Sequence, residues 1–198
     1  MTDSSGSYQG IELLAPVGAD AHLGGNARWG DPYTFSPTVW GYMVSRFGVR
    51  RVLDLGSGIG NAALWFYRAG CQVVAVDGFE QNTRGSVYPV IVQDLTLRPV
   101  ICEVDLVYCQ EVVEHIDAAY IEHLMTSLTN APVVLITHAV PGQLGHHHVN
   151  CQPSEYWIER FRERGYVQSE RDTEVVRAHA ATDGAVYLRN TGLVFLKA

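Results

Sequence analysis

Val52-Leu53-Asp54-Leu55-Gly56-Ser57-Gly58-Ile59-Gly60 is an apolar run, typical of a buried strand, that ends in a glycine-rich turn. Glycines at alternate positions let the backbone pass close to a ligand in conformations that a Cβ would forbid. The helix that we expect from Asn61 onward presents free N–H groups to the same ligand. The stretch therefore predicts a binding site for a ligand that carries an adenosine.

The composition predicts one globular domain. The chain has 198 residues, of which 47% are hydrophobic, and this suits a single large core. A formal net charge of −7 argues against broad binding of a nucleic-acid backbone, so nucleic acid is an unlikely partner. The four cysteines lack CxxC spacing and are expected to be reduced. No signal pattern or membrane-spanning apolar run is visible, so we expect a soluble, cytoplasmic protein.

Apolar runs alternate with helical patterns along the chain. The strands are expected near residues 51–55, 73–76, 88–92, 105–109 and 132–137, and the helices near 38–47, 61–69, 118–128 and 154–164. Two further strands are expected near 166–171 and 193–197. This rhythm predicts an α/β fold with a doubly wound, Rossmann-like sheet of about seven strands.

Three acidic residues sharpen the prediction of the ligand. A dinucleotide site would favour glycine at position 61, but the chain has Asn61 and places Asp54 just before the glycines. A carboxylate there would repel a phosphate and would suit the ammonium group of a methionine moiety. Asp77 ends the next expected strand, where an acid can accept both hydroxyls of a ribose, and Asp94 follows the third strand near the expected adenine amine.

Together these features resemble the cofactor motifs of the class I S-adenosylmethionine (SAM)-dependent methyltransferases, from about residue 22 to residue 196. The resemblance implies SAM as the cofactor. It also implies a mostly parallel sheet whose last two strands form an antiparallel edge hairpin. The residues that it assigns to the cofactor are Asp54, Gly56, Ser57, Gly58, Gly60, Asp77, Gly78, Asp94, Leu95 and Gln110.

A second group of polar residues follows the fourth expected strand, in Glu111-Val112-Val113-Glu114-His115. If this turn is helical, Glu111, Glu114 and His115 share one face, where oxygen and nitrogen atoms can hold a divalent metal. The run resembles the Glu-x-x-Glu-His motif of the small-RNA 2′-O-methyltransferases and the ubiquinone-pathway O-methyltransferases. That resemblance implies a further histidine after the fifth strand, and His148 matches best by spacing. The sequence Asn150-Cys151-Gln152 downstream departs from the pattern.

Three interpretations of this group stay open. In the first, Glu111, Glu114, His115 and His148 bind magnesium, manganese or zinc. In the second, no metal binds, and Glu114 and His115 only shape the turn beside the cofactor. In the third, a histidine acts as general base, and the candidates are His115, His138 and one of His146 to His148. The residues predicted to be catalytic are His115, His148 and Glu114.

The segment before the first strand is rich in glycine, proline and aromatic residues. We expect residues 1–37 to form a cap or lid over the acceptor pocket and residues 38–198 to form the methyltransferase domain. Trp29, Tyr33 and Phe35 either pack on the core or close over a bound acceptor, and both roles are compatible.

The sequence thus predicts a SAM-dependent methyltransferase that acts on an oxygen of a small or medium-sized acceptor. A hydroxyl acceptor has a high pKa and needs a base or a metal, which the Glu/Glu/His group can supply. The alternatives are an RNA 2′-O-methyltransferase, a noncatalytic SAM-binding regulatory protein and a nicotinamide oxidoreductase, the last disfavoured by Asn61 and Asp54. The identity of the acceptor and the oligomeric state have no signature in the sequence.

Overall fold

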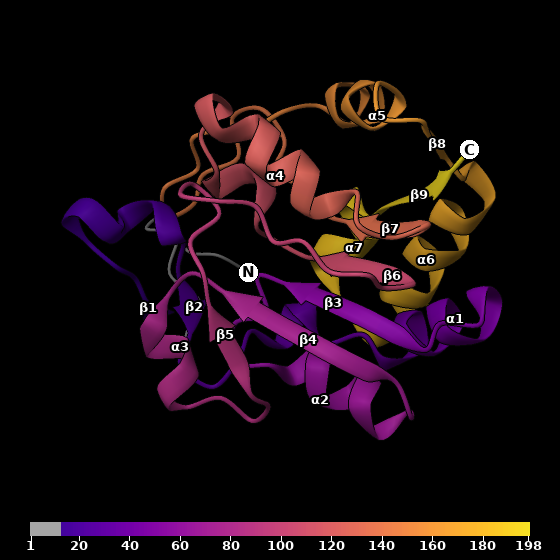
Figure 1. Ribbon diagram of the computed structural model, residues 1–198, viewed down its shortest axis with the longest axis horizontal. Coiled ribbons are helices and arrows are strands. Elements are labelled where there is room, and N and C mark those ends of the chain that lie inside the picture. Colours follow the sequence, from indigo (N-terminus) through magenta and orange to yellow (C-terminus); the bar gives the residue numbers. More distant parts are fainter. Residues whose placement is uncertain (1–12) are drawn as a thin grey trace.

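A seven-stranded sheet, in the order β5-β4-β3-β6-β7-β9-β8, forms the centre of the molecule (Figure 1). The structure is a computed structural model and describes residues 13–198, apart from the side chain of Asn26. The strands of this sheet are β3 (Arg51–Leu55), β4 (Gln72–Asp77), β5 (Val90–Val92), β6 (Leu106–Cys109), β7 (Val133–Ile136), β8 (Tyr166–Gln168) and β9 (Leu193–Lys197). The predicted seven-stranded α/β sheet is confirmed.

Strand direction also follows the prediction. Strands β3 to β7 pair in parallel, and β9 runs antiparallel to both of its neighbours, β7 and β8. The fourth strand of the parallel set, β6, lies directly beside β3, with Asp54 opposite Tyr108. The carboxyl ends of β3, β4 and β6 therefore meet at one edge of the sheet.

Helices cover both faces of this sheet. They are α1 (Pro37–Phe47), α2 (Asn61–Arg68), α3 (Glu80–Arg84), α4 (Ile121–Leu128), α5 (Ser154–Arg162), α6 (Glu170–Asp183) and α7 (Val186–Thr191). Figure 1 shows α4 and α5 on one side of the sheet and α1 and α2 on the other. Within β7, Val134 and Ile136 join the first core, whereas Val133 and Leu135 join the second. Alternate side chains thus enter opposite cores, which explains why the strand reads as a continuous apolar run.

Three details differ from the expected elements. The strand expected over 166–171 ends at Gln168, because the Ser169 hydroxyl accepts a hydrogen bond from the Asp172 N–H and caps α6. The antiparallel strands β8 and β9 are joined by two helices, α6 and α7, which the sequence pattern did not predict. The helix expected over 118–128 starts as a 3₁₀ turn, Ala118–Tyr120, and becomes α4 at Ile121.

The N-terminal segment forms a small layer of its own. A short strand, β1 (Leu13–Leu14), pairs with β2 (Asn26–Ala27), and a 3₁₀ helix, η1 (Gly18–Leu23), lies between them. A second 3₁₀ helix, η2 (Pro32–Thr34), leads into α1. The first twelve residues of the predicted cap lie outside the described residues. None of the helices in the described part of the chain has the length and apolar character to cross a membrane.

Candidate active site

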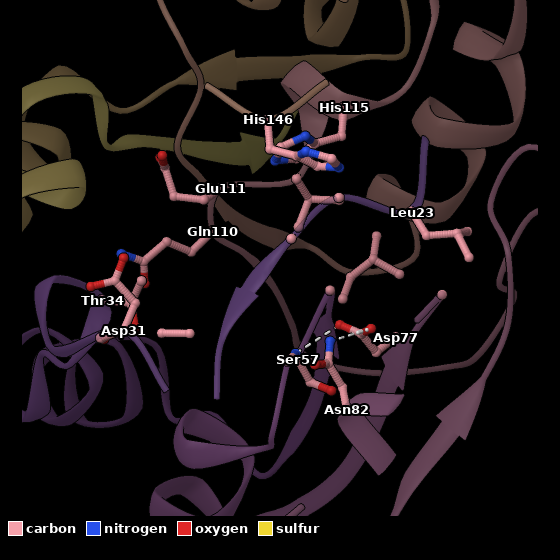
Figure 2. Close-up of a pocket in the computed structure, with 18 of the residues that line it drawn as sticks. Leu23, Asp31, Thr34, Ser57, Asp77, Asn82, Gln110, Glu111, His115 and His146 are labelled. Atoms are coloured by element: carbon pink, nitrogen blue, oxygen red, sulfur yellow. Dashed lines mark hydrogen bonds between the residues drawn. The ribbon is translucent and has the colours of Figure 1, made fainter. Parts of the chain in front are cut away.

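A cavity of about 1020 Å³ opens at the carboxyl ends of β3, β4 and β6 (Figure 2). This is where ligands bind in open α/β sheets. The turn after β3 forms its floor, and residues of the N-terminal segment, the turn after β6 and α7 complete its walls. Of the residues assigned to the cofactor from the sequence, all except Gly60 line this cavity.

The glycines of the first turn are required by its geometry. Gly56, Gly58 and Gly60 have φ angles of 76°, 55° and 85°, in the left-handed region that favours glycine. A Cβ at Gly56 would also overlap Cγ2 of Val112, and one at Gly60 would lie 3.0 Å from the Cβ of Tyr88. The turn therefore packs against Val112 and Tyr88 and leaves the cavity open on the other side.

Asp77 fastens this turn to the next one. One carboxylate oxygen accepts a hydrogen bond from the Gly58 N–H at 2.8 Å, and the other accepts from the Phe79 N–H and the Asn82 amide, both at 2.9 Å. Burial raises the pKa of Asp77, and these three hydrogen bonds oppose that shift. The first oxygen, Oδ2, accepts only one of these bonds and keeps a lone pair that can accept a further hydrogen bond from a ligand, whereas both lone pairs of Oδ1 are used.

The other two acids have different surroundings. Asp54 is 2% exposed and accepts a hydrogen bond from the Ala63 N–H at 3.0 Å, and burial raises its pKa to about 7. Asp94 accepts from Nε2 of His22 at 2.8 Å and from the backbone and hydroxyl of Thr96. Burial alone would raise the pKa of Asp94, but the hydrogen bonds from His22 and Thr96 lower it.

A second group of side chains gathers around the turn after β6. Ligand atoms of Glu114, His115 and His148 lie within 4.8 Å of one another, and the two imidazole rings are 5.1 Å apart between centroids. Glu114 is fully buried, and neither of its carboxylate oxygens has a hydrogen-bond partner in the structure. Nδ1 of His115 also lacks one. We call these three residues the Glu114 cluster.

Burial sets the protonation of this cluster. It raises the pKa of Glu114 well above the usual value, and the charge of Glu111 adds to that shift. It lowers the pKa of His115 to about 4, with a smaller contribution from His148, whose own pKa is also lowered by burial. Buried polar atoms without partners are costly, so the cluster is suited to a cation or to a proton.

Glu111 lies beside Glu114 but is fixed by a different set of hydrogen bonds. The turn is helical only over Val113–His115 and is a 3₁₀ helix, η3, so the shared face expected for an α-helical turn does not form. The φ angle of Glu111 is 55°, unusual for a residue with a side chain. Its N–H donates to the Thr137 hydroxyl, which in turn donates to its carboxylate, each at 2.8 Å. Figure 2 shows the Glu111 side chain directed away from His115.

The remaining histidine candidates divide by position. His146 lines the cavity, and its Nε2 has no hydrogen-bond partner in the structure. His147 has a φ angle of 49° and does not line the cavity. His138 is also outside the lining and bonds through Nε2 to the Ser154 hydroxyl at 3.0 Å. The geometry thus favours His115, His146 and His148 over His138 for any role toward a bound molecule.

The N-terminal segment reaches the cavity through residues that the sequence did not single out. Leu23 packs against Gly78, where an added Cβ would lie 2.9 Å from Cδ2 of Leu23. Asp31 accepts hydrogen bonds from the Tyr33 N–H at 2.8 Å and the Tyr187 hydroxyl at 2.9 Å. Tyr187 belongs to α7, which the sequence did not predict. In contrast, Trp29, Tyr33 and Phe35 are not part of the cavity lining, and Phe35 packs edge-on against Trp40.

The match to a protein family gives the class of the protein, a methyltransferase. The chain belongs to the methyltransferase domain family, which it matches over residues 34–193. No curated protein sequence gives a significant match.

Several solved structures share the fold. Magnesium protoporphyrin IX methyltransferase (ChlM) from Synechocystis PCC 6803 with bound SAM has a TM-score of 0.58 at 14% identity, covering 81% of this chain and 77% of that one. The methyltransferase domain of bacterial CtHen1-CN has a TM-score of 0.53 at 16% identity, covering 67% and 86%. The [4+2]-cyclase SpnF has a TM-score of 0.55 at 14% identity, covering 85% and 84%. The cyclase shows that the fold alone does not fix the reaction.

Proposed function

We propose that this chain binds SAM in the cavity and transfers its methyl group to an oxygen of a small or medium-sized acceptor, with a divalent ion held by the Glu114 cluster. The observation that carries the proposal is the position of this cluster, which adjoins the same cavity as the glycine turn and the three acids. Donor and acceptor would therefore meet in one cavity.

The cofactor would be oriented by the residues predicted from the sequence. Asp77 would accept a hydrogen bond from the ribose through Oδ2, Asp54 would pair with the methionine ammonium, and Asp94 would accept from the adenine amine. The glycine turn lets the backbone lie against the methionine portion. Methyl transfer from a sulfonium is an in-line displacement, so alignment and exclusion of water provide most of the catalysis.

The residues of the Glu114 cluster fit a divalent ion. One carboxylate and two imidazoles form a mixed oxygen and nitrogen donor set, which suits manganese or zinc and also allows magnesium. Both carboxylate oxygens of Glu114 are buried without partners, as expected of a ligand. A bound ion would lower the pKa of an acceptor hydroxyl. Glu111 is held by Thr137, so we propose Glu114, His115 and His148 as the ligand set and keep Glu111 as the neighbouring carboxylate.

A metal-free variant of this chemistry uses the same residues. Burial lowers the pKa of His115 to about 4, so its imidazole is neutral at pH 7 and is free to accept the proton that the acceptor hydroxyl releases, although only as a weak base. His148 is the second candidate for this base. In either variant the sulfur–methyl bond breaks, the oxygen–methyl bond forms and S-adenosylhomocysteine (SAH) is released.

The cavity favours a small acceptor over RNA. Among the described residues, its lining contains no arginine or lysine. Proteins that bind RNA use such cations on the phosphate backbone. The acidic lining would instead repel a polyphosphate chain.

Calorimetric titration tests the proposal in two steps. SAM is expected to bind and NAD is not, which separates a methyltransferase from a nicotinamide oxidoreductase. Manganese is then expected to bind once per chain, with at least about tenfold weaker binding in the Glu114→Gln variant. The matched control is Glu103→Gln, a charge change at an exposed position outside the cavity lining. Equal binding of manganese and zinc to wild type and Glu114→Gln would reject the ion site.

A further inference from the structure

The cavity has more carboxylates than the proposed cofactor uses. Its acidic lining residues are Asp31, Asp54, Asp77, Asp94 and Glu111. The proposed function assigns Asp54, Asp77 and Asp94 to the ammonium, ribose and adenine of SAM. Asp31 and Glu111 are left over, and the described lining residues include no arginine or lysine to neutralise them.

These two carboxylates come from distant parts of the chain and are rigidly held. Asp31 caps η2 and accepts the hydrogen bond of Tyr187 from α7, whereas Glu111 is locked by Thr137 in its left-handed conformation. Both side chains line the same cavity, on the side where Gln110 lies (Figure 2). Strained residues at the end of a strand are typical of functional sites.

A third side chain points to a ligand independently of these charges. Gln110 is 9% exposed, and its Nε2 has no hydrogen-bond partner in the structure. The Tyr108 hydroxyl donates to Oε1 of Gln110, which fixes the orientation of the amide. Figure 2 shows the Gln110 amide directed toward Asp31 and Thr34, on the far side of the cavity from Asp77. A buried amide nitrogen that faces a cavity calls for an acceptor atom on a ligand.

Aromatic rings form the wall beside this group. Trp40, Tyr108 and Tyr187 all line the cavity. Nε1 of Trp40 is buried beside the Tyr108 hydroxyl. Such rings can stack on an aromatic ring of a ligand, and their faces attract a cation.

We propose that Asp31, Glu111 and Gln110 form an acceptor subsite that binds a protonated nitrogen of the methyl acceptor, with Gln110 donating to a neighbouring oxygen. The substrate class is therefore a cationic amine that also carries a hydroxyl, such as an amino alcohol or a phenol with an amine side chain. This inference rests on the proposed function, because it assigns the acceptor of the same reaction. The competing structural explanation is that Asp31 only caps η2 and Glu111 only fixes its turn.

Three phenols that differ in side-chain charge test the subsite in the wild-type protein. The probes are tyramine, p-ethylphenol and p-hydroxyphenylpropionate, which are cationic, neutral and anionic at pH 7. Each is titrated into SAH-saturated protein and followed by saturation-transfer NMR. We expect tyramine to bind roughly tenfold or more tightly than either of the other probes. Equal binding of the three, tighter binding of the anion, or no binding of any probe would overturn the proposal.

Two near-isosteric variants then locate the effect. Asp31→Asn and Glu111→Gln keep the shapes and allow the hydrogen bonds to Tyr187 and Thr137, but remove one charge each. Each is expected to weaken tyramine binding by roughly tenfold and to leave p-ethylphenol unchanged. Glu103→Gln is the control and should change neither. An equal loss in this control would overturn the proposal, as would a lack of effect in both cavity variants.

SAM affinity separates this inference from the proposed function. Calorimetry should give the same SAM affinity, within about twofold, in wild type, Asp31→Asn and Glu111→Gln. A strong loss of SAM affinity in Asp31→Asn would assign that residue to the cofactor and overturn the subsite. If SAM binds but tyramine is not preferred, the subsite fails and the methyltransferase proposal stands. If wild type does not bind SAM, the proposed function fails whichever probe binds.

Discussion

The cavity has a cofactor half, around Asp54, Asp77 and Asp94, and an acceptor half, around Gln110 and the Glu114 cluster. The two halves differ in how completely their polar groups are paired by hydrogen bonds. In the cofactor half, Asp77 accepts three hydrogen bonds from the protein and Asp94 also accepts three. In the acceptor half, the Glu114 carboxylate and the Gln110 amide nitrogen are buried without partners. The carboxylates of the cofactor half are therefore preorganised by the chain itself, although the Ser57 hydroxyl there is also buried without a partner, whereas the acceptor half requires a bound ion, proton or substrate to satisfy its buried carboxylate and amide.

The largest effect is expected from a change in the preorganised half. Gly56→Ala places a Cβ against Val112 in a residue whose φ angle is 76°. Overpacking and the left-handed conformation together should destabilise the fold by about 2–5 kcal/mol and distort the cofactor turn. Thermal unfolding and SAM calorimetry measure both effects.

The control for this variant is Gly85→Ala. Gly85 has a negative φ angle and open space around the position of a Cβ. It should leave both measurements unchanged. Equal behaviour of the two variants would mean that the turn is not constrained as the geometry implies.

Next in size is the loss of the ribose acid. Asp77→Ala removes a carboxylate that ties the glycine turn to the start of α3 and that we propose to bind the cofactor. Hydrogen bonds to a charged acceptor are worth about 1.5–3 kcal/mol, so SAM affinity should fall by roughly ten- to hundredfold. Calorimetry that finds unchanged affinity would remove Asp77 from the cofactor site.

The buried carboxyl of Asp54 is expected to make the stability of the fold depend on pH. Burial raises its folded-state pKa from 3.8 to about 7, so between pH 4 and pH 7 the folded chain holds a proton that the unfolded chain has released. The protonated carboxyl of Asp54 therefore adds to the free energy of unfolding below pH 4, and this stabilisation is lost as the pH rises to 7. Relative to Asp54→Asn, wild type should lose about 3 kcal/mol of unfolding free energy over this window, since each unit of pKa difference corresponds to about 1.4 kcal/mol. Urea unfolding at several pH values measures the difference, and parallel pH profiles would contradict the assignment.

The smallest effect is expected at the edge of the cofactor half. His22→Ala removes the hydrogen bond of η1 to Asp94, which is partly exposed to solvent. A single bond of this kind is worth about 0.5–1.5 kcal/mol, so SAM affinity should change by no more than about tenfold. A loss as large as that of Asp77→Ala would instead make the N-terminal segment a principal part of the cofactor site.

The same contrast explains what the sequence could predict. The cofactor half is built mainly from strands and the turns that directly follow them, so Asp54, Asp77 and the glycines were visible as local patterns. The acceptor half joins η2, the turn after β6 and α7, and no local pattern relates Asp31 to Tyr187. The position of Glu111 depends on the Thr137 hydroxyl from the neighbouring strand, which a helical spacing rule does not include.

The measurement that most directly tests the central claim is transfer of a labelled methyl group. Wild-type protein is incubated with SAM carrying a ¹³C-methyl group, manganese and a small-molecule cell extract that includes added tyramine, and products are identified by mass spectrometry and NMR. The account predicts a labelled methyl group on an oxygen of a small molecule, with equimolar SAH, and a fall in product after treatment with EDTA. Full activity after EDTA treatment would favour the metal-free base His115 or His148. SAM binding without any labelled product, with or without metal, would contradict the account and leave a noncatalytic SAM-binding protein.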